Sequence, residues 1–219
     1  MKYFVLIGCM SICAMAHASI SINFDSQVNA DITTFTGGTG YPQTGGMVTI
    51  SGIDHQLAVT AGGKTGSMFF VNETKTVPIN LFGIMEVYTL INSTFGSFGA
   101  INGKVEVHGT GGLLDTFTLT QGINIRDHFA GPFNNVATGL NGTLPYQTGV
   151  RFDQQKFVLS SAFHSATLTE IRFIGENNFG SNGNPMLQSL NLRAVPEPAS
   201  MVVLGLGLVA LVRRKSRVR

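Results

Sequence analysis

The chain has 219 residues, of which 14 are basic and 12 are acidic, and it contains no tryptophan. Six of the basic residues lie at the two ends, so residues 19–195 hold eight basic and eleven acidic residues and carry a net charge of −3. A negative body lacks the basic face that neutralises phosphates, which excludes nucleic acid as a partner.

The amino-terminal segment is predicted to be a secretion signal. Lys2 supplies a positive charge, residues 3–15 form an apolar run, and Ala16 and Ala18 are the small residues that signal peptidase recognises. Cleavage is therefore expected before Ser19. The alternative is a buried helix formed by the same apolar run.

Both cysteines of the chain, Cys9 and Cys13, lie inside this segment. The mature protein therefore has no cysteine for a disulfide, for thiol catalysis or for a cysteine-ligated zinc. Lipidation at Cys9 is disfavoured, because few apolar residues precede it and the apolar run continues beyond it.

The body that follows is rich in Gly, Thr, Asn and Ser, with short apolar runs between turn residues, which is typical of an all-β protein. It carries too many large apolar residues to be disordered, and no part of it shows a sustained helical period. The runs predicted as strands are residues 19–24, 46–51, 56–60, 67–72, 84–92, 103–108, 114–120, 150–159, 167–174 and 186–193.

Alternating side chains indicate that these strands bury one face. In residues 104–108 the two valines share a face from which the polar side chains are excluded. Leu168 lies on the same face as Ile171 and Phe173 only if a β-bulge occurs at Thr169–Glu170.

Glycine-rich segments are predicted to connect these strands. Residues 109–112, Gly-Thr-Gly-Gly, are typical of a hairpin turn between the strands at 103–108 and 114–120. Strands with one apolar face need a second sheet to cover that face, so a β-sandwich is the expected architecture.

The central part of the body also resembles a known domain type. A strand at 86–93, a loop of small residues, the hairpin, and the segment Gly-Ile-Asn-Ile-Arg-Asp at 122–127 are similar to galactose-binding-like jelly-roll domains. The resemblance implies a jelly-roll-like sandwich of a kind found on secreted glycan-active proteins. Related domains often bind sugars with tryptophan, and the aromatic residues that could serve in its place are Tyr41, Tyr88 and Tyr146.

Motifs for catalysis are absent from the sequence. There is no Gly-x-Ser-x-Gly elbow, and no pair of mature histidines has metal-ligand spacing. Asp153 and Glu170 remain as candidates for the carboxylate pair that cleaves glycosides, because such pairs meet in space rather than in sequence. Because the other motifs are absent, we expect no catalytic residue and no metal site. The histidines interpreted as surface or structural residues are His55, His108, His128 and His164.

One loop is a candidate for ligand contact. Arg126 and Asp127 follow the Gly-Ile-Asn-Ile segment, and the alternative is a local ion pair that closes the turn before Gly131-Pro132. Residues 176–178 and 182–184 offer oxygen atoms suited to calcium, although no Asp-x-Asp-x-Asp-Gly pattern is present. No cofactor is expected, with calcium as the alternative.

The most specific pattern lies near the carboxyl terminus. Pro196, Glu197 and Pro198 precede the apolar run 201–212, and a basic cluster follows it. With the two residues before it the run has about 14 residues, fewer than the roughly 20 of an ordinary spanning helix. A short hydrophobic helix is expected, and a buried core helix is the alternative. The cluster, predicted to stay on the cytoplasmic side, contains Arg213, Arg214 and Lys215.

This three-part arrangement resembles the PEP-CTERM sorting signal. In that family an exosortase, a membrane enzyme similar to transpeptidases, recognises the tail, and the carriers occur in Gram-negative bacteria that make exopolysaccharide. The resemblance covers about 25 residues. The resemblance implies where the protein is sorted in the cell, and it implies no activity.

The sequence thus predicts a signal peptide at 1–18, a jelly-roll-like β-sandwich at 19–194 and a sorting and anchoring segment at 195–219. The expected protein is a non-enzymatic one at the cell envelope, the outer surface or the extracellular matrix of a Gram-negative bacterium, with exopolysaccharide as its candidate ligand. The expected partners are signal peptidase, an exosortase-type enzyme and, before processing, the membrane. The alternatives are a polysaccharide hydrolase or lyase and a purely structural coat protein.

Overall fold

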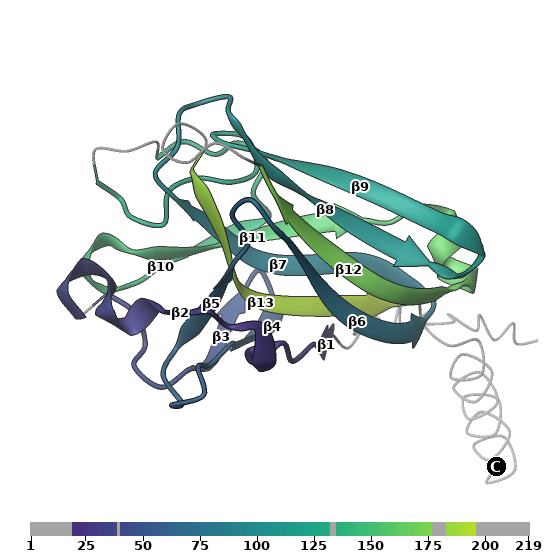
Figure 1. Ribbon diagram of the computed structural model, residues 1–219, viewed down its shortest axis with the longest axis horizontal. Helices are drawn as coiled ribbons and strands as arrows, with labels where there is room; N and C mark the ends of the chain where they lie inside the picture. The colour runs from purple at the N-terminus through teal and green to yellow at the C-terminus, as the bar shows by residue number, and fades with distance from the viewer. Residues whose placement is uncertain (1–18, 39, 132–134, 177–182, 196–219) are drawn as a thin grey trace, which may run out of the picture.

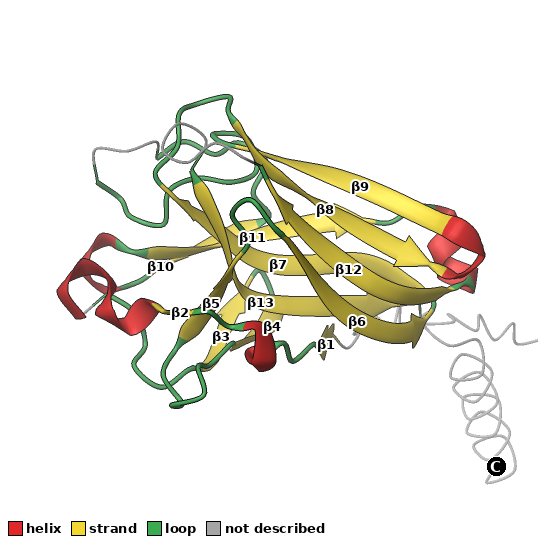
Figure 2. Ribbon diagram, viewed as in Figure 1, coloured by secondary structure: helices red, strands yellow, loops and turns green. Residues whose placement is uncertain are grey.

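A computed structural model of the protein describes residues 19–38, 40–131, 135–176 and 183–195. The predicted signal peptide, including Ala16 and Ala18, and the tail beyond Val195, with its predicted hydrophobic helix, lie outside these residues. Within them the chain is almost entirely strands and loops, with short 3-10 turns near the ends of strands, as Figure 2 shows. This confirms the all-β prediction. No helix in the described ranges is long and apolar enough to cross a membrane.

Two antiparallel sheets form the body (Figure 1). The large sheet contains, in spatial order, β10 (Gly142–Pro145), β11 (Arg151–Val158), β7 (Ile84–Thr94), β13 (Asn184–Ala194), β5 (Gly66–Phe69) and β2 (Ala30–Asp31), and β1 (Ser19–Ser21) also pairs with β13. The small sheet contains β6 (Thr74–Phe82), β12 (Thr167–Gly175), β8 (Ile101–Gly109) and β9 (Leu113–Thr120). A separate hairpin is formed by β3 (Gly46–Ile50) and β4 (Ile53–Leu57).

The short 3-10 segments connect or flank these strands. They are η1 (Asp25–Gln27), η2 (Ile32–Gly38), η3 (Thr110–Gly112), η4 (Gln147–Gly149) and η5 (Ser161–Ser165). The η3 turn joins β8 to β9 at the predicted hairpin position, with φ of 75° at Gly111 and 79° at Gly112. A positive φ is sterically unfavourable for any residue that has a Cβ atom, which explains the glycines at this turn.

The main hydrophobic core lies between the two sheets. On the small sheet its side chains come from alternate positions, such as Val105 and Val107 of β8, as the sequence predicts. On β12 the register shifts between Leu168 and Glu170, so the bulge that would put Leu168 on the inward face is present. This bulge lets Leu168 join Ile171 in the core. The result is a β-sandwich that is consistent with a jelly-roll-like domain.

The outer face of the large sheet is covered by the β3–β4 hairpin. Side chains of β13 alternate between the two faces of the sheet. Leu190 and Leu192 point into the main core, whereas Ser189 and Asn191 point toward the hairpin and contact His55. A second, smaller core fills the space beneath the hairpin, η2 and η4. Its buried members are Ile32, Tyr41, Ile50, Leu57, Leu90, Val150 and Phe152.

His55 is fully buried in this layer and is neutral. Gln154 Nε2 lies 2.7 Å from His55 Nε2. The Nδ1 atom lies 2.8 Å from the Asn191 amide and 3.2 Å from Ser189 Oγ. Burial lowers the pKa of His55 from 6.5 to about 4, against a small opposing effect of Asp54.

Three strands were missed in the sequence, namely β2, β6 and β10. Strand β6 contains Pro78, which cannot donate a ladder hydrogen bond, and β10 ends in Pro145. Both strands lie at the edge of a sheet, where proline is tolerated because one side of the strand has no partner. Whether a strand lies at an edge depends on long-range pairing, so the local sequence pattern did not predict β6 or β10 as strands.

His55 makes stability depend on pH. Its pKa is lower in the folded protein than in the unfolded chain, so acid favours unfolding as the pH falls from 6.5 to 4 and has no effect through this group above 6.5. The full loss is about 3 kcal/mol. Between pH 4 and 7, the free energy of unfolding measured with urea should change by about 3 kcal/mol less in the His55→Gln variant than in the wild type. His108→Gln, on the partly exposed side of β8, serves as the control; equal slopes for wild type and His55→Gln would contradict the prediction.

Candidate functional site

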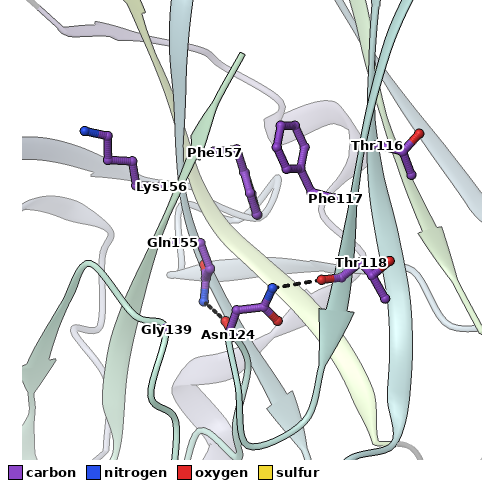
Figure 3. A pocket seen from close by; sticks show the side chains of 8 residues that line it. All are labelled: Thr116, Phe117, Thr118, Asn124, Gly139, Gln155, Lys156 and Phe157. Carbon is purple, nitrogen blue, oxygen red and sulfur yellow. Dashed lines mark hydrogen bonds between the residues drawn. The ribbon is translucent and has the colours of Figure 1, made fainter. Parts of the chain in front are cut away.

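A pocket of about 350 Å³ opens between the edge strand β9 of the small sheet and strand β11 of the large sheet. Figure 3 shows the residues that line it, which are Thr116, Phe117, Thr118, Asn124, Gly139, Gln155, Lys156 and Phe157. Two sheets that diverge at an open edge leave such a wedge, and here it is bordered by both sheets and by the loop that follows β9.

Two phenylalanine rings face each other across the wedge. The centroids of Phe117 on β9 and Phe157 on β11 lie 4.8 Å apart with 32° between the ring planes. Phe157 is buried in the main core, whereas Phe117 is only partly buried and packs against that core. The pocket therefore has an aromatic wall that joins the two sheets and remains partly accessible.

Two amides set the polar side of the pocket. Asn124 accepts from the Thr120 backbone N–H at 2.8 Å and donates to the Thr118 carbonyl at 2.8 Å, so it binds to the free edge of β9. Gln155 accepts from Thr89 and Ile91 and donates to the Asn124 carbonyl at 3.1 Å. Both amides are held by the protein itself, which fixes the shape of the opening.

The free edge of β9 presents backbone groups to the pocket. This strand pairs with β8 alone, and the backbone of Thr118 and Thr120 faces the open side, where Asn124 binds it. In an antiparallel strand every second residue presents its N–H and C=O to the same side. The N–H and C=O of Thr116 therefore face the opening, while Figure 3 shows its side chain pointing away from the rings.

A buried ion pair lies one pleat further along the same face of β11, where Asp153, Gln155 and Phe157 alternate. Asp153 is completely buried, and Arg126 binds it with two hydrogen bonds of 2.8 and 2.9 Å. The same carboxylate also accepts hydrogen bonds from the Asn92 amide at 2.8 Å and from the Thr143 hydroxyl at 2.7 Å. Every carboxylate lone pair thus has a partner, as a buried charge requires.

The two residues predicted as a ligand loop, Arg126 and Asp127, point to different partners. Arg126 forms its ion pair with Asp153, and its remaining donors bind the Asn135 carbonyl and Thr143. Asp127 instead accepts from the backbone N–H groups of Phe95 and Phe129. The ion pair of Arg126 is therefore long-range, not the local one with Asp127 that the sequence offered as the alternative. Both side chains are engaged in holding the loops.

Other charged residues are placed on the outer face of the large sheet. Lys156 Nζ lies 2.6 Å from Glu86, and Arg193 lies 2.9 Å from the same carboxylate, which also accepts from the Tyr88 hydroxyl at 2.7 Å. Partial burial alone raises the pKa of Glu86, but these hydrogen bonds outweigh burial and lower the pKa to about 2. The Lys156 ammonium is thus directed away from the pocket, as Figure 3 also shows.

The structure separates several residues that the sequence singled out. Asp153 lies on β11 of the large sheet and Glu170 on β12 of the small sheet, where Glu170 pairs with Arg172. Tyr41 and Tyr88 are buried, with 2% and 3% of their surface exposed, so they do not form an exposed sugar platform. Tyr146 packs edge-on against Phe152.

The calcium prediction falls largely outside the described residues, since 177–182 are not among them. In the part that the structure describes, no three His, Cys, Asp or Glu side chains are grouped to hold a metal ion. Ser19, predicted to follow the signal cleavage site, is the first residue of β1 and pairs with Arg193. The sorting residues Pro196, Glu197, Pro198, Arg213, Arg214 and Lys215 lie outside the described residues.

Comparison with known proteins gives a match at one end of the chain. Residues 194–217 match the PEP-CTERM protein-sorting motif. This match confirms the resemblance of the tail and indicates an exported, envelope-associated protein that an exosortase sorts. No curated protein is significantly similar to the chain.

Loss of Arg126 should destabilise the protein strongly. In Arg126→Ala the buried Asp153 carboxylate loses its two hydrogen bonds to a guanidinium and keeps only the more distant Arg151 at 3.9 Å, which costs about 3–5 kcal/mol in the free energy of unfolding. Arg172→Ala breaks the more exposed pair with Glu170 and should cost less than about 1 kcal/mol. Urea unfolding of both variants at pH 7 measures the difference, and similar values for the two would show that the Asp153 site tolerates an unpaired charge.

Proposed function

We propose that the mature protein is a non-enzymatic component of the outer surface or extracellular matrix of a Gram-negative bacterium, and that it binds exopolysaccharide in the pocket between β9 and β11. The observation that carries the proposal is the combination of a sorting motif at residues 194–217 with an aromatic-walled pocket on a β-sandwich. The motif supports a location at the cell envelope, and the pocket supports the proposed class of ligand.

The chemistry of the pocket supports an uncharged, hydroxyl-rich ligand. The volume of about 350 Å³ lies at the lower end of the range of about 300–1,000 Å³ for small-molecule sites. Phe117 offers a ring for the apolar C–H face of a sugar, and the backbone of Thr116 offers one donor and one acceptor for hydroxyl groups. Lys156, the charged residue of the lining, is neutralised by Glu86.

The arrangement of acidic side chains supports a role without catalysis. Glycoside hydrolysis uses two carboxyl groups about 5–10 Å apart on either side of the bond that is cleaved. Asp153 has no exposed surface and is bound by Arg126, and Glu170 is on the other sheet. Neither Asp153 nor Glu170 lines the β9–β11 pocket.

A structural coat protein is the second candidate, favoured by the edge of β9. Edge strands are commonly protected from association by Lys or Pro. Strand β6, the other edge of the small sheet, contains both Lys75 and Pro78, whereas β9 has eight residues with neither. Sedimentation of the purified protein without polysaccharide separates the two functions, because a coat protein would self-associate under these conditions.

Replacing one wall of the pocket should weaken glycan binding. Phe117→Leu keeps an apolar side chain against the core but removes the ring, and we expect about a tenfold loss of affinity for an exopolysaccharide bound by the wild type. The assay is a glycan array followed by titration with the 19–195 fragment, which contains both hydrophobic cores. Phe82→Leu, an exposed ring outside the pocket lining, is the control. Absence of binding to any polysaccharide would refute the ligand part of the proposal.

Removal of the tail should change location and leave the fold intact. A chain that ends at Val195 retains every residue of the two cores, so its melting temperature should equal that of the mature protein. Cell fractionation with mass spectrometry should find it released from the envelope, whereas the intact chain is retained. An unfolded truncation, or one found in the same fraction as the intact chain, would contradict the role of the sorting tail.

A further inference from the structure

Both ends of the sandwich body lie at the same end of the large sheet. Strand β1 pairs with the carboxyl-terminal part of β13, with Ser19 opposite Arg193. Val195 donates a hydrogen bond of 2.7 Å to the Gly83 carbonyl, so the chain leaves the domain beside Gly83. We call this the exit end. The opposite end of β13, at Asn184, pairs with Thr94 and lies near the loop that joins β7 to β8.

The sequence between the exit end and the apolar segment is short. Five residues, 196–200, separate Val195 from Met201, where the apolar run begins. A fully extended chain advances about 3.3–3.6 Å per residue, so this link spans at most about 20 Å. An embedded tail therefore holds the exit end of the domain close to the bilayer.

The surface at the exit end carries large apolar side chains. Phe82 precedes Gly83 and has 66% of its surface exposed. Val158, at the end of β11, is 60% exposed, and Leu114, near the start of β9, is 52% exposed. All three residues lie at this end of the sandwich, since Phe82 ends β6, Val158 pairs with Glu86 near the start of β7, and Leu114 pairs with His108 beside the η3 turn. Phe82 and Leu114 face outward from the small sheet and Val158 faces outward from the large sheet, because the residue before each of them packs in the main core.

Two acidic residues close to this surface are engaged by partners within the protein. Glu86, the acidic residue paired with Val158 in the sheet, is compensated by Lys156 and Arg193. Asp115 accepts from the Ser160 backbone N–H at 2.7 Å and is tied to the loop between β11 and η5. Amphipathic surfaces bind bilayers by placing apolar side chains about 5–10 Å into the boundary between headgroups and acyl chains.

We propose that, while the tail is embedded, the exit end rests on the bilayer surface through Phe82, Leu114 and Val158. The occupant of this apolar surface is the lipid boundary region of the membrane that holds the tail. The loops at the opposite end, including Phe98 between β7 and β8, then point away from the membrane. The inference depends on the sorting tail and does not depend on exopolysaccharide binding, so either can fail without the other.

The absence of tryptophan allows a direct test, because one introduced tryptophan is the single indole in the chain. Mature chains with Phe82→Trp or Phe98→Trp are reconstituted into phosphatidylcholine vesicles with brominated acyl chains, which quench nearby tryptophan. Both sites are well exposed, at 66% and 68%, so neither substitution enters a core. The same variants without residues 196–219 set the emission of the unanchored domain.

We expect Phe82→Trp to lose most of its emission in the anchored form and Phe98→Trp to keep most of it. Leu114→Trp repeats the measurement at the other edge of the small sheet and should behave as Phe82→Trp does. Equal quenching at positions 82 and 98, stronger quenching at 98, or no quenching at 82 would each overturn the proposal. Glycan binding by the same preparations is measured in parallel, so that failure of the pocket is distinguished from failure of the orientation.

Discussion

The carboxylate of Asp153 organises the end of the sandwich next to the pocket. A fully buried charge must be matched, and Arg126 from the loop after β9 provides two hydrogen bonds to it. The guanidinium also binds the Asn135 carbonyl, so this one side chain ties β11 to two parts of the connection between β9 and β10. Arg151 adds hydrogen bonds to the carbonyl of Asp127 at 3.0 and 2.9 Å. The position of Asn124 at the pocket follows from this fixed loop.

The strands of the main core could be predicted because their signal is local. Alternation in β8 places Val105 and Val107 on one face regardless of what covers them. The imperfect alternation of β12 indicated where a bulge would have to lie if Leu168 is inward, and the register shift before Glu170 is at that place. Strands β6 and β10 escaped prediction because proline obscured their pattern, and only the completed sheet shows that each lies at an edge.

The pocket could be predicted only in part. Alternation along β9 puts Phe117 on the same face as the buried Leu119, but its contact with Phe157 joins two sheets and depends on how the sheets are stacked. Asn124 lies inside the segment 122–127 that resembles galactose-binding-like domains, but a neutral amide carries a weaker sequence signal for a site than the adjacent charged pair Arg126 and Asp127. The charged residues Arg126 and Asp127 were the candidates from the sequence, and in the structure both form hydrogen bonds that hold loops. The partly accessible wall of the pocket is built from an aromatic ring and neutral amides.

The position of β13 governs how the domain responds to traction. This strand is in the interior of the large sheet, bonded to β7 along its length and to β1 and β5 on its other side. A force applied through Val195 acts along the strand axis, parallel to both ladders. Hydrogen bonds loaded in this shear direction must rupture together, whereas bonds loaded at one end open singly. The carboxyl-terminal end of the domain is thus held by a strand that is paired on both sides.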